Sequence, residues 1–255
     1  MTVPTYEYPV SSCDVPSVRH RLLEEYRRFR TECLESLRGD SNTSVMNQIH
    51  DLTWHTAVFP TLNEARRLEP SRTVSGAMWE LVTAGYAHLM ALGIRRLVDT
   101  DSRADSLWNV LVRVEKRPEL LTRELFVCHD GLPFDTEAAK ARYYENLSPS
   151  ERTSARYLPN SGPGGWAMSE LLHDGFDKLH GKTARRKRTD RLPMKVVEEL
   201  KEALRHPAIK KVCTMADKRF AHAERFAASA APAPTATYDE VDQALQQLVR
   251  VVGAG

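Results

Sequence analysis

The sequence lacks cysteine pairs at the spacings that metal or redox sites use. Its four cysteines lie far apart, and no histidine stands at zinc-finger spacing from them: Cys13, Cys33, Cys128 and Cys213. We therefore expect reduced thiols rather than a disulfide framework. Also absent are a phosphate-cradling glycine loop, a G-x-S-x-G elbow and an H-E-x-x-H pair. These absences argue against nucleotide-dependent and serine-hydrolase chemistry, and we expect no cofactor and no metal.

Long apolar runs and strand-like alternation are missing as well. No apolar stretch approaches the length that crosses a bilayer, and the first ten residues have neither the basic start nor the apolar run of a signal peptide. We expect a cytoplasmic protein with no membrane contact. The formal charge of +2 over 255 residues decides little, because nucleic-acid binding depends on local clusters of charge.

The pattern that is present is helical. Apolar residues recur at spacings of three and four through most of the chain, with no run of five alternating residues and no fixed repeat. The expected helices span about 16–38, 43–59, 73–99, 105–115, 118–128, 138–147, 167–180 and 192–205, with one more from Pro207 and another after Thr237. The sequence predicts an all-α fold in a single domain, 1–255, whose core is about 16–128 and 192–252.

Three local features refine this prediction. The second helix should end before Pro60, because proline pushes the preceding residue out of helical geometry. The stretch 73–99 is apolar around most of its circumference, which is typical of a helix at the centre of a bundle. The segment 129–191 is irregular and basic, and we expect it to be an insertion with a Gly- and Pro-rich loop at 160–166.

The helix after Pro207 carries an unusual flank. At about 100° per residue, its core stripe includes Ile209, Val212 and Ala216. A second stripe beside it contains two large apolar residues that bracket an arginine and a histidine: Met215, Arg219, His222 and Phe226. That composition predicts a partly buried contact, and we expect a twofold homodimer interface with Met215 and Phe226 in it.

The segment A-D-K-R-F-A-H-A-E, residues 216–224, resembles the signature of the HEPN superfamily, in its AbiU-like abortive-infection branch. Residues 79–99 followed by S-L-W-N-V-L, and the terminal T-Y-D-E-V-D-Q-A-L-Q-Q-L, resemble other parts of that branch. The resemblance implies a small helical protein that acts on RNA as a dimer. It also implies a metal-independent endoribonuclease of a toxin or antiphage system, with a cognate antitoxin or other neutralising partner.

The resemblance carries over to particular residues. His222 matches the family's histidine, which would assist proton transfer at the RNA 2′-OH or the leaving oxygen, and Asp217 matches its polar position. The family's arginine does not match, because Ala216 stands there. Arg219, one turn from His222, is the replacement that the sequence offers for stabilising phosphate charge.

The tract K-T-A-R-R-K-R-T-D-R, residues 182–191, is the strongest phosphate-binding signal in the chain, because clustered cations release counterions from nucleic acid. The candidate RNA-binding residues are Lys182, Arg185, Arg186, Lys187, Arg188, Arg191 and Lys218. The alternative is a solvated loop. Two weaker pairs, Asp51 with His55 and His173 with His180, read better as ordinary structural histidines than as acid–base or metal sites.

Two hypotheses remain from the sequence. The first is an RNase of HEPN type that uses His222 with Arg219 and Asp217. The second is a catalytically inactive helical module that binds nucleic acid or another protein, which Ala216 favours.

Overall fold

The structure is a computed structural model that describes residues 5–39, 43–69, 75–145, 147–148, 160–181, 185–221 and 235–253. These residues form helices and no strand, and a single isolated bridge pairs Thr122 with Arg191. The all-α prediction is confirmed. No helix among them is both long and apolar enough to span a membrane. The α-helices are α1 (His20–Arg38), α2 (Val45–Leu68), α3 (Gly76–Leu97), α4 (Leu107–Glu115), α5 (Arg123–Cys128), α6 (Thr136–Glu145), α8 (Trp166–His180), α9 (Met194–Ala203), α10 (Pro207–Met215) and α11 (Tyr238–Gly253).

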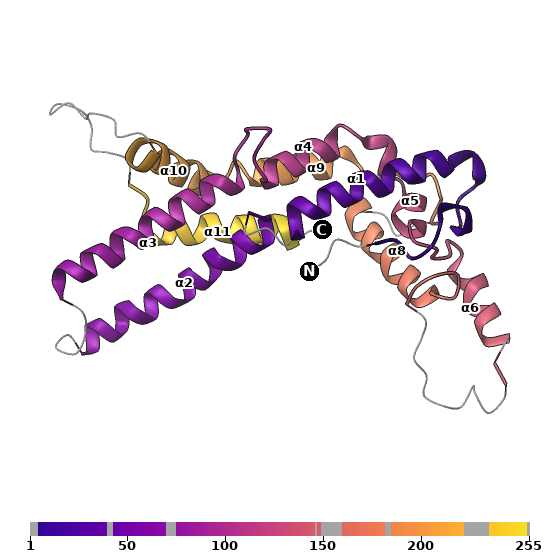
Figure 1. Cartoon of the computed structure of the whole chain (residues 1–255), viewed down its shortest axis with the longest axis horizontal. Helices are drawn as coiled ribbons and strands as arrows, with labels where there is room; N and C mark the ends of the chain where they lie inside the picture. Colours follow the sequence, from indigo (N-terminus) through magenta and orange to yellow (C-terminus); the bar gives the residue numbers. More distant parts are fainter. Residues whose placement is uncertain are drawn as a thin grey trace. The chain divides into compact units, whose positions relative to one another are not determined.

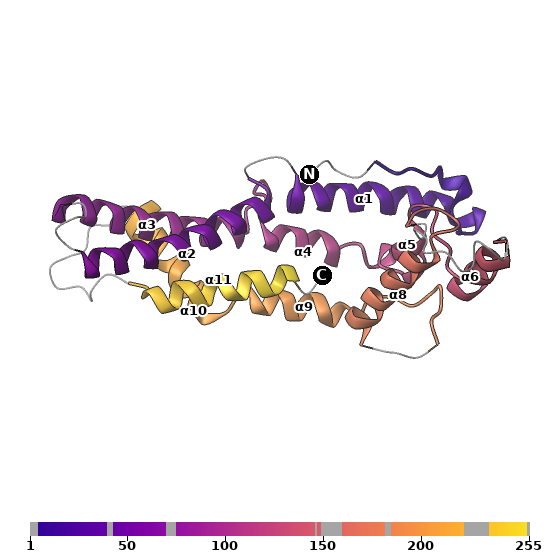
Figure 2. The same ribbon diagram turned by 90° about the horizontal axis from the view of Figure 1, so that it is seen from below.

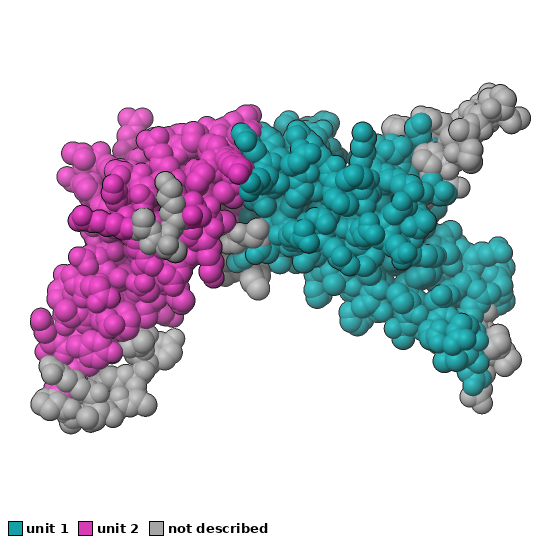
Figure 3. Space-filling view, turned by 180° about the vertical axis from the view of Figure 1, so that it is seen from behind, with its two compact units in different colours: residues 1, 35–112, 198–254 teal, residues 2–34, 113–197, 255 magenta. Residues whose placement is uncertain are grey.

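The chain divides into two compact units, shown in different colours in Figure 3. Unit 1 contains residues 35–112 and 198–254, and unit 2 contains residues 2–34 and 113–197. The sequence predicted one domain with an insertion at 129–191. The sequence did not predict that the N-terminal residues 2–34 belong to the same unit as that middle segment.

Unit 1 is built on the antiparallel pair α2 and α3, which lie side by side (Figure 1). Helices α10 and α11 pack on α3 and on each other, and Figure 2 shows α11 beside α10. The start of α11 has the capping box that the sequence predicted. Thr237 Oγ1 accepts from the Glu240 amide at 3.3 Å, and Glu240 accepts from the Thr237 amide at 2.8 Å.

Two predictions about unit 1 were wrong. Helix α2 does not end before Pro60 but continues to Leu68. Pro60 is exposed, and the buried Phe59 beside it stacks on Tyr86 at 4.1 Å and on Tyr238 at 5.5 Å. This packing holds the helix through the proline and offsets the missing backbone hydrogen bond.

The second error concerns α3, which was expected at the centre of a bundle. Only its C-terminal half is buried, at Met90, Ala91, Ile94 and Leu97. Leu81 is 66% exposed and Met78 is 49% exposed. An all-round apolar pattern therefore does not mean all-round burial here.

Unit 2 has its own hydrophobic core, in which the N-terminal segment and α1 pack on α5. The buried members are Cys13, Val15, Leu23, Tyr26, Phe29, Cys33, Leu120, Leu125, Val127 and Cys128. Tyr8 lies against two glycines with left-handed backbone, Gly131 (φ 79°) and Gly162 (φ 65°). A Cβ at Gly162 would stand 2.1 Å from the Tyr8 hydroxyl, so the loop at 160–166 needs glycine both for its turn and for this contact.

Candidate functional site

The segment that carries the HEPN resemblance begins where α10 ends. From Ala216 to Ala221 the backbone forms a π-helical turn, η5, and the sequence places His222 directly after it. Such turns are rare, and they occur often at functional sites because they shift side chains out of the regular helical register. The described part of the predicted catalytic group therefore has a distinctive backbone.

Asp217, the polar residue of the predicted group, is held by an arginine from another helix. Arg95 of α3 donates from Nε to the Asp217 carboxylate, and its Nη1 lies 3.2 Å from Asp99. The hydrogen bond to Asp217 raises the pKa of Arg95. Both partners are partly open to solvent, with 37% of the Arg95 side chain and 46% of the Asp217 side chain exposed. A half-open ion pair of this kind fixes orientation more than it adds stability.

Ala216 stands at the position where the HEPN motif has its arginine, and this position is buried. Ala216 is fully buried together with Ile209 and Val212, on the core side that the helical spacing predicted. A guanidinium at this position would point into the packed interior of unit 1. The sequence therefore departs from the family motif at a place where the fold has no room for the missing side chain.

Met215 was expected on a partly buried flank facing a second copy. It is 4% exposed within the chain itself, and its sulfur accepts from the Ala236 amide at 3.2 Å. A side chain already covered in this way has little surface left for a partner, so Met215 belongs to the core of unit 1. The remaining members of that flank, Phe226 and His222, lie outside the described residues, as does the side chain of Arg219. Lys218 is exposed.

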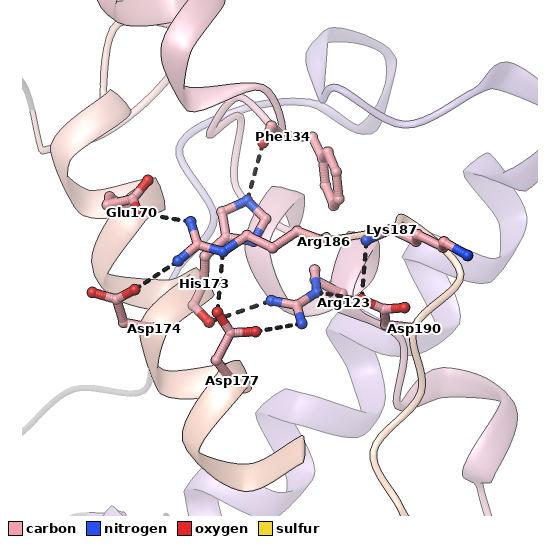
Figure 4. Close-up of polar contacts among 9 residues, drawn as sticks. All are labelled: Arg123, Phe134, Glu170, His173, Asp174, Asp177, Arg186, Lys187 and Asp190. Atoms are coloured by element: carbon pink, nitrogen blue, oxygen red, sulfur yellow. Dashed lines mark hydrogen bonds and ion pairs between the residues drawn. The ribbon is translucent and has the colours of Figure 1, made fainter. Parts of the chain in front are cut away.

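Carboxylates of unit 2 form ion pairs with part of the basic tract (Figure 4). Arg186 donates to three acidic residues of α8: its Nη1 to Glu170 at 2.7 Å, its Nη2 to Asp174 at 2.7 Å and its Nε to Asp177 at 3.1 Å. A guanidinium with three carboxylate partners is held by short, charge-assisted hydrogen bonds. Arg186 therefore fastens the tract to α8.

Arg188 is engaged in the same way. It donates to Glu124 at 2.9 Å and to Asp14 at 2.8 Å, and Glu124 also accepts from Arg19. The Glu124 side chain is only 1% exposed, so its charge depends on these two arginines for compensation.

A buried arginine that the sequence reading missed lies beneath this layer. The Arg123 side chain is 1% exposed; it donates to Asp177 at 2.5 Å and to Asp190 at 3.0 Å (Figure 4). Burial alone raises the pKa of Asp177, but hydrogen bonds from Arg123 and Arg186 outweigh it, and the pKa is lowered. The pKa of Asp190 is lowered against the effect of burial by the Lys187 amide and by Arg123. No spacing signal marks Arg123, because its partners are 54 and 67 residues away.

The backbone completes this attachment. The Arg123 amide donates to the Asp190 carbonyl at 2.9 Å, and the Leu192 amide donates to the Leu121 carbonyl at 2.9 Å. The described part of the tract is therefore an ordered strap rather than a solvated loop. Its exposed cations are Arg185, Lys187 and Arg191, whereas Lys182 lies outside the described residues. A cleft of about 950 Å³ lies beside the strap, lined by Arg185, Lys178, Glu137 and Thr136 among others.

The weaker histidine pairs have structural explanations. His55 donates from Nδ1 to the backbone carbonyl of Asp51 at 2.5 Å, not to its carboxylate. His173 is 1% exposed, donates to the Phe134 carbonyl at 3.0 Å, and has its pKa lowered by burial. Helix α8 runs through Gly175 without a break and ends at His180, with Gly181 (φ 70°) as its C-cap. Among the described residues no three His, Cys, Asp or Glu side chains are grouped as metal ligands.

Comparison with known proteins gives no match: no family model, no curated protein and no solved structure matches this chain.

Proposed function

We propose that this chain is a HEPN-like, RNA-directed protein that acts as a homodimer and cleaves RNA without a metal ion, in a toxin or antiphage system. The observation that supports this most is the pair Arg95 and Asp217. It fixes the polar residue of the motif on a π-helical turn that leads directly to His222.

The chemistry follows from these groups. In metal-independent cleavage the RNA 2′-oxygen attacks the adjacent phosphorus, the 5′-oxygen leaves, and one proton is removed from the 2′-OH while another is given to the leaving oxygen. His222 is the residue that moves a proton, because an imidazole titrates near neutral pH. Asp217 accepts a hydrogen bond from Arg95, so its carboxylate is held in one orientation, which is a positioning role.

Charge on the reacting phosphate needs a cation. Arg219 is the candidate from the sequence. Another guanidinium, that of Arg95, contacts Asp217 just after the end of α10. Arg95 already faces Asp217 and Asp99, so it cannot by itself provide a free positive charge. Arg219 is therefore the residue that stabilises the phosphate, and Arg95 holds Asp217 in place.

RNA would be held by the exposed cations. These are Lys218 beside the motif in unit 1, and Arg185, Lys187 and Arg191 on the strap of unit 2. Arg186 and Arg188 are assigned to the structure of unit 2 rather than to RNA, since carboxylates surround both. A cognate neutralising protein belongs to the same proposal.

The second candidate function is an inactive binding module, and one observation favours it. Ala216 occupies the motif position of the arginine and is fully buried, so that catalytic group is missing where the family has it. The same surface would then bind RNA or a partner protein without cleaving it.

The test is RNA cleavage in EDTA by the purified protein, with His222→Ala in parallel and the solution mass of both measured. We expect cleavage by the wild type and its loss in a variant of unchanged mass. Salt-sensitive RNA binding without cleavage on several RNAs would establish the binding module instead. Neither cleavage nor RNA binding would exclude an RNA-directed protein and leave only a helical module that binds another protein.

A further inference from the structure

Helix α3 has an exposed apolar stripe on the side that the described residues of unit 1 leave open. Its large residues are 39–66% exposed: Met78 at 49%, Leu81 at 66%, Leu89 at 39% and Leu92 at 39%. At about 100° per residue, these four and Gly85 fall within about 40° of one line along the helix. The buried residues of α3, such as Met90 and Ile94, lie on its other side. Exposed apolar residues that form one line, rather than being scattered singly, are the kind of surface on which protein partners bind.

The stripe is symmetric about its central residue. Met78 and Leu92 each stand seven positions from Gly85, and Leu81 and Leu89 each stand four positions from it. A second copy of α3 laid antiparallel across the first, with a twofold axis at Gly85, would place Met78 on the partner's Leu92. It would likewise place Leu81 on the partner's Leu89. Residues related in this reciprocal way are what an isologous contact requires.

Gly85 supports the same arrangement. Its φ is not positive, and a Cβ built on it would meet nothing within 4 Å, so neither the backbone conformation nor packing within the chain requires glycine. A glycine inside a helix costs about 1 kcal/mol relative to alanine. At the crossing point of two helices the absence of a side chain lets the backbones approach closely, and this gives the residue a role.

The surroundings of the stripe complete an interface. A groove of about 510 Å³ runs beside Leu89 and Leu92, and α2 lines it with the polar Asp51 and His55. Apolar residues in the middle with polar groups at the margin is the usual composition of a protein–protein contact. From Met78 to Leu92 the stripe extends about 21 Å along the axis, at about 1.5 Å per residue.

We propose that α3 is the surface by which two copies of this chain associate, antiparallel and with the twofold axis at Gly85. The contact relies on exposure and symmetry in α3 alone, and it holds whether or not the protein acts on RNA. The α3 stripe thus takes the place of Met215 as the apolar surface of the dimer interface, because Met215 is buried within unit 1.

The test is disulfide cross-linking of Gly85→Cys under mild oxidation. Two thiols at the axis approach within disulfide reach, whose Cβ separation is about 4 Å. The open space at Gly85 makes this substitution compatible with the fold. The control is Glu80→Cys, which is exposed on the same helix but about 140° from the stripe. Cys13, Cys33 and Cys128 are buried, and wild type reports the background from Cys213.

We expect a covalent dimer with Gly85→Cys and none above background with Glu80→Cys. Equal cross-linking of both would overturn the proposal. Orientation is tested by mixing Leu81→Cys with Leu89→Cys: the antiparallel contact links the mixture but not either variant alone, whereas a parallel contact links each variant alone. In solution, wild type should have twice the chain mass of 28.9 kDa and Leu81→Glu should be a monomer. A wild-type monomer at micromolar concentration would also contradict the proposal.

Discussion

Arg123 and Asp177 form an ion pair at 2.5 Å in which the arginine side chain is 1% exposed and the aspartate side chain is 13% exposed. The arginine starts α5 and the aspartate lies near the end of α8, so the pair joins two helices of unit 2. Asp190 is the second partner of Arg123, and it brings the basic strap into the same network. The charges that looked like an RNA site in the sequence are thus partly the means by which unit 2 is held together.

Removing Arg123 should destabilise unit 2 strongly. Arg123→Met leaves Asp177 and Asp190 without their shared partner, and breaking a buried pair from one side costs about 3–5 kcal/mol. Hydrogen exchange of the α5 and α8 amides reports the free energy of opening in unit 2. Arg103→Met is the matched control, because Arg103 pairs with Asp101 while 88% exposed. Equal protection in wild type and Arg123→Met would show that the network is not structural.

Unit 2 should lose stability as pH falls from about 6.5 to about 4. Burial lowers the pKa of His129 from 6.5 to about 4, so in this window the unfolded chain binds a proton that the folded chain does not. His129 contributes a slope of up to about 1.4 kcal/mol per pH unit. His173, whose pKa burial also lowers, acts in the same direction. The lowered pKa values of Asp177 and Asp190 act only below this window, because carboxylates in the unfolded chain titrate near 4.

The measurement is the urea midpoint of wild type and His129→Gln at pH 7 and pH 5. His129→Gln keeps a side-chain donor that can reach the Phe126 carbonyl, which His129 Nδ1 contacts at 2.8 Å, and does not titrate. The wild-type midpoint should fall more than that of the variant. Parallel decreases in the two proteins would mean that His129 does not carry this pH dependence.

We expect some cations of the strap to bind RNA and others to stabilise unit 2. Replacing the exposed Arg185, Lys187 and Arg191 together with glutamine should weaken RNA binding and make it less salt-dependent. For single strands the slope of log K against log salt falls by about 0.7 for each phosphate that the protein no longer neutralises. Thermal stability should not change. Arg186→Gln is the contrasting variant, expected to lower stability because it removes the guanidinium that Glu170, Asp174 and Asp177 share. Unchanged affinity in the triple variant would remove the strap from the RNA site.

Asp217 and Arg95 should act as one unit in cleavage. Asp217→Asn and Arg95→Met should each lower the rate by about 10²-fold, the lower range for positioned acid–base groups, and the double variant should lose no more than either alone. Arg96→Met is the control, because Arg96 is its exposed neighbour. The pH–rate profile separates positioning from simple loss of structure, since it should shift in Asp217→Asn while the fold is retained. Additive losses would mean that the two residues act independently.

Periodicity in the sequence predicted much of the fold, because a helix places its apolar residues at spacings of three and four along the chain. The helical segments and the capping box at Thr237 and Glu240 came from neighbours only a few residues apart. The wrong end of α2 at Pro60 has the opposite cause. Stacking of Phe59 on Tyr86 and Tyr238 is tertiary, and it overrides the local effect of proline.

The candidate site was harder to predict for the same reason. Spacing placed the buried Ala216 on the core side of its helix, but it could not show that Arg95, 122 residues earlier, reaches Asp217. The sequence of the basic tract also could not show that two of its arginines are neutralised. The carboxylates that pair with Arg186 and Arg188 are distant in sequence and come from α8, from α5 and from Asp14. A charge run defines a binding surface only when the opposing charges of the fold are known.

The most direct test of the central claim is the chemistry of the RNA ends produced in EDTA by the wild type. We expect cleavage that leaves a 2′,3′-cyclic phosphate and a 5′-hydroxyl, is blocked by a 2′-deoxy substitution at the cleaved position, and is lost in His222→Ala. Cleavage that requires a divalent cation, proceeds at a 2′-deoxy position, or persists in His222→Ala would contradict the claim.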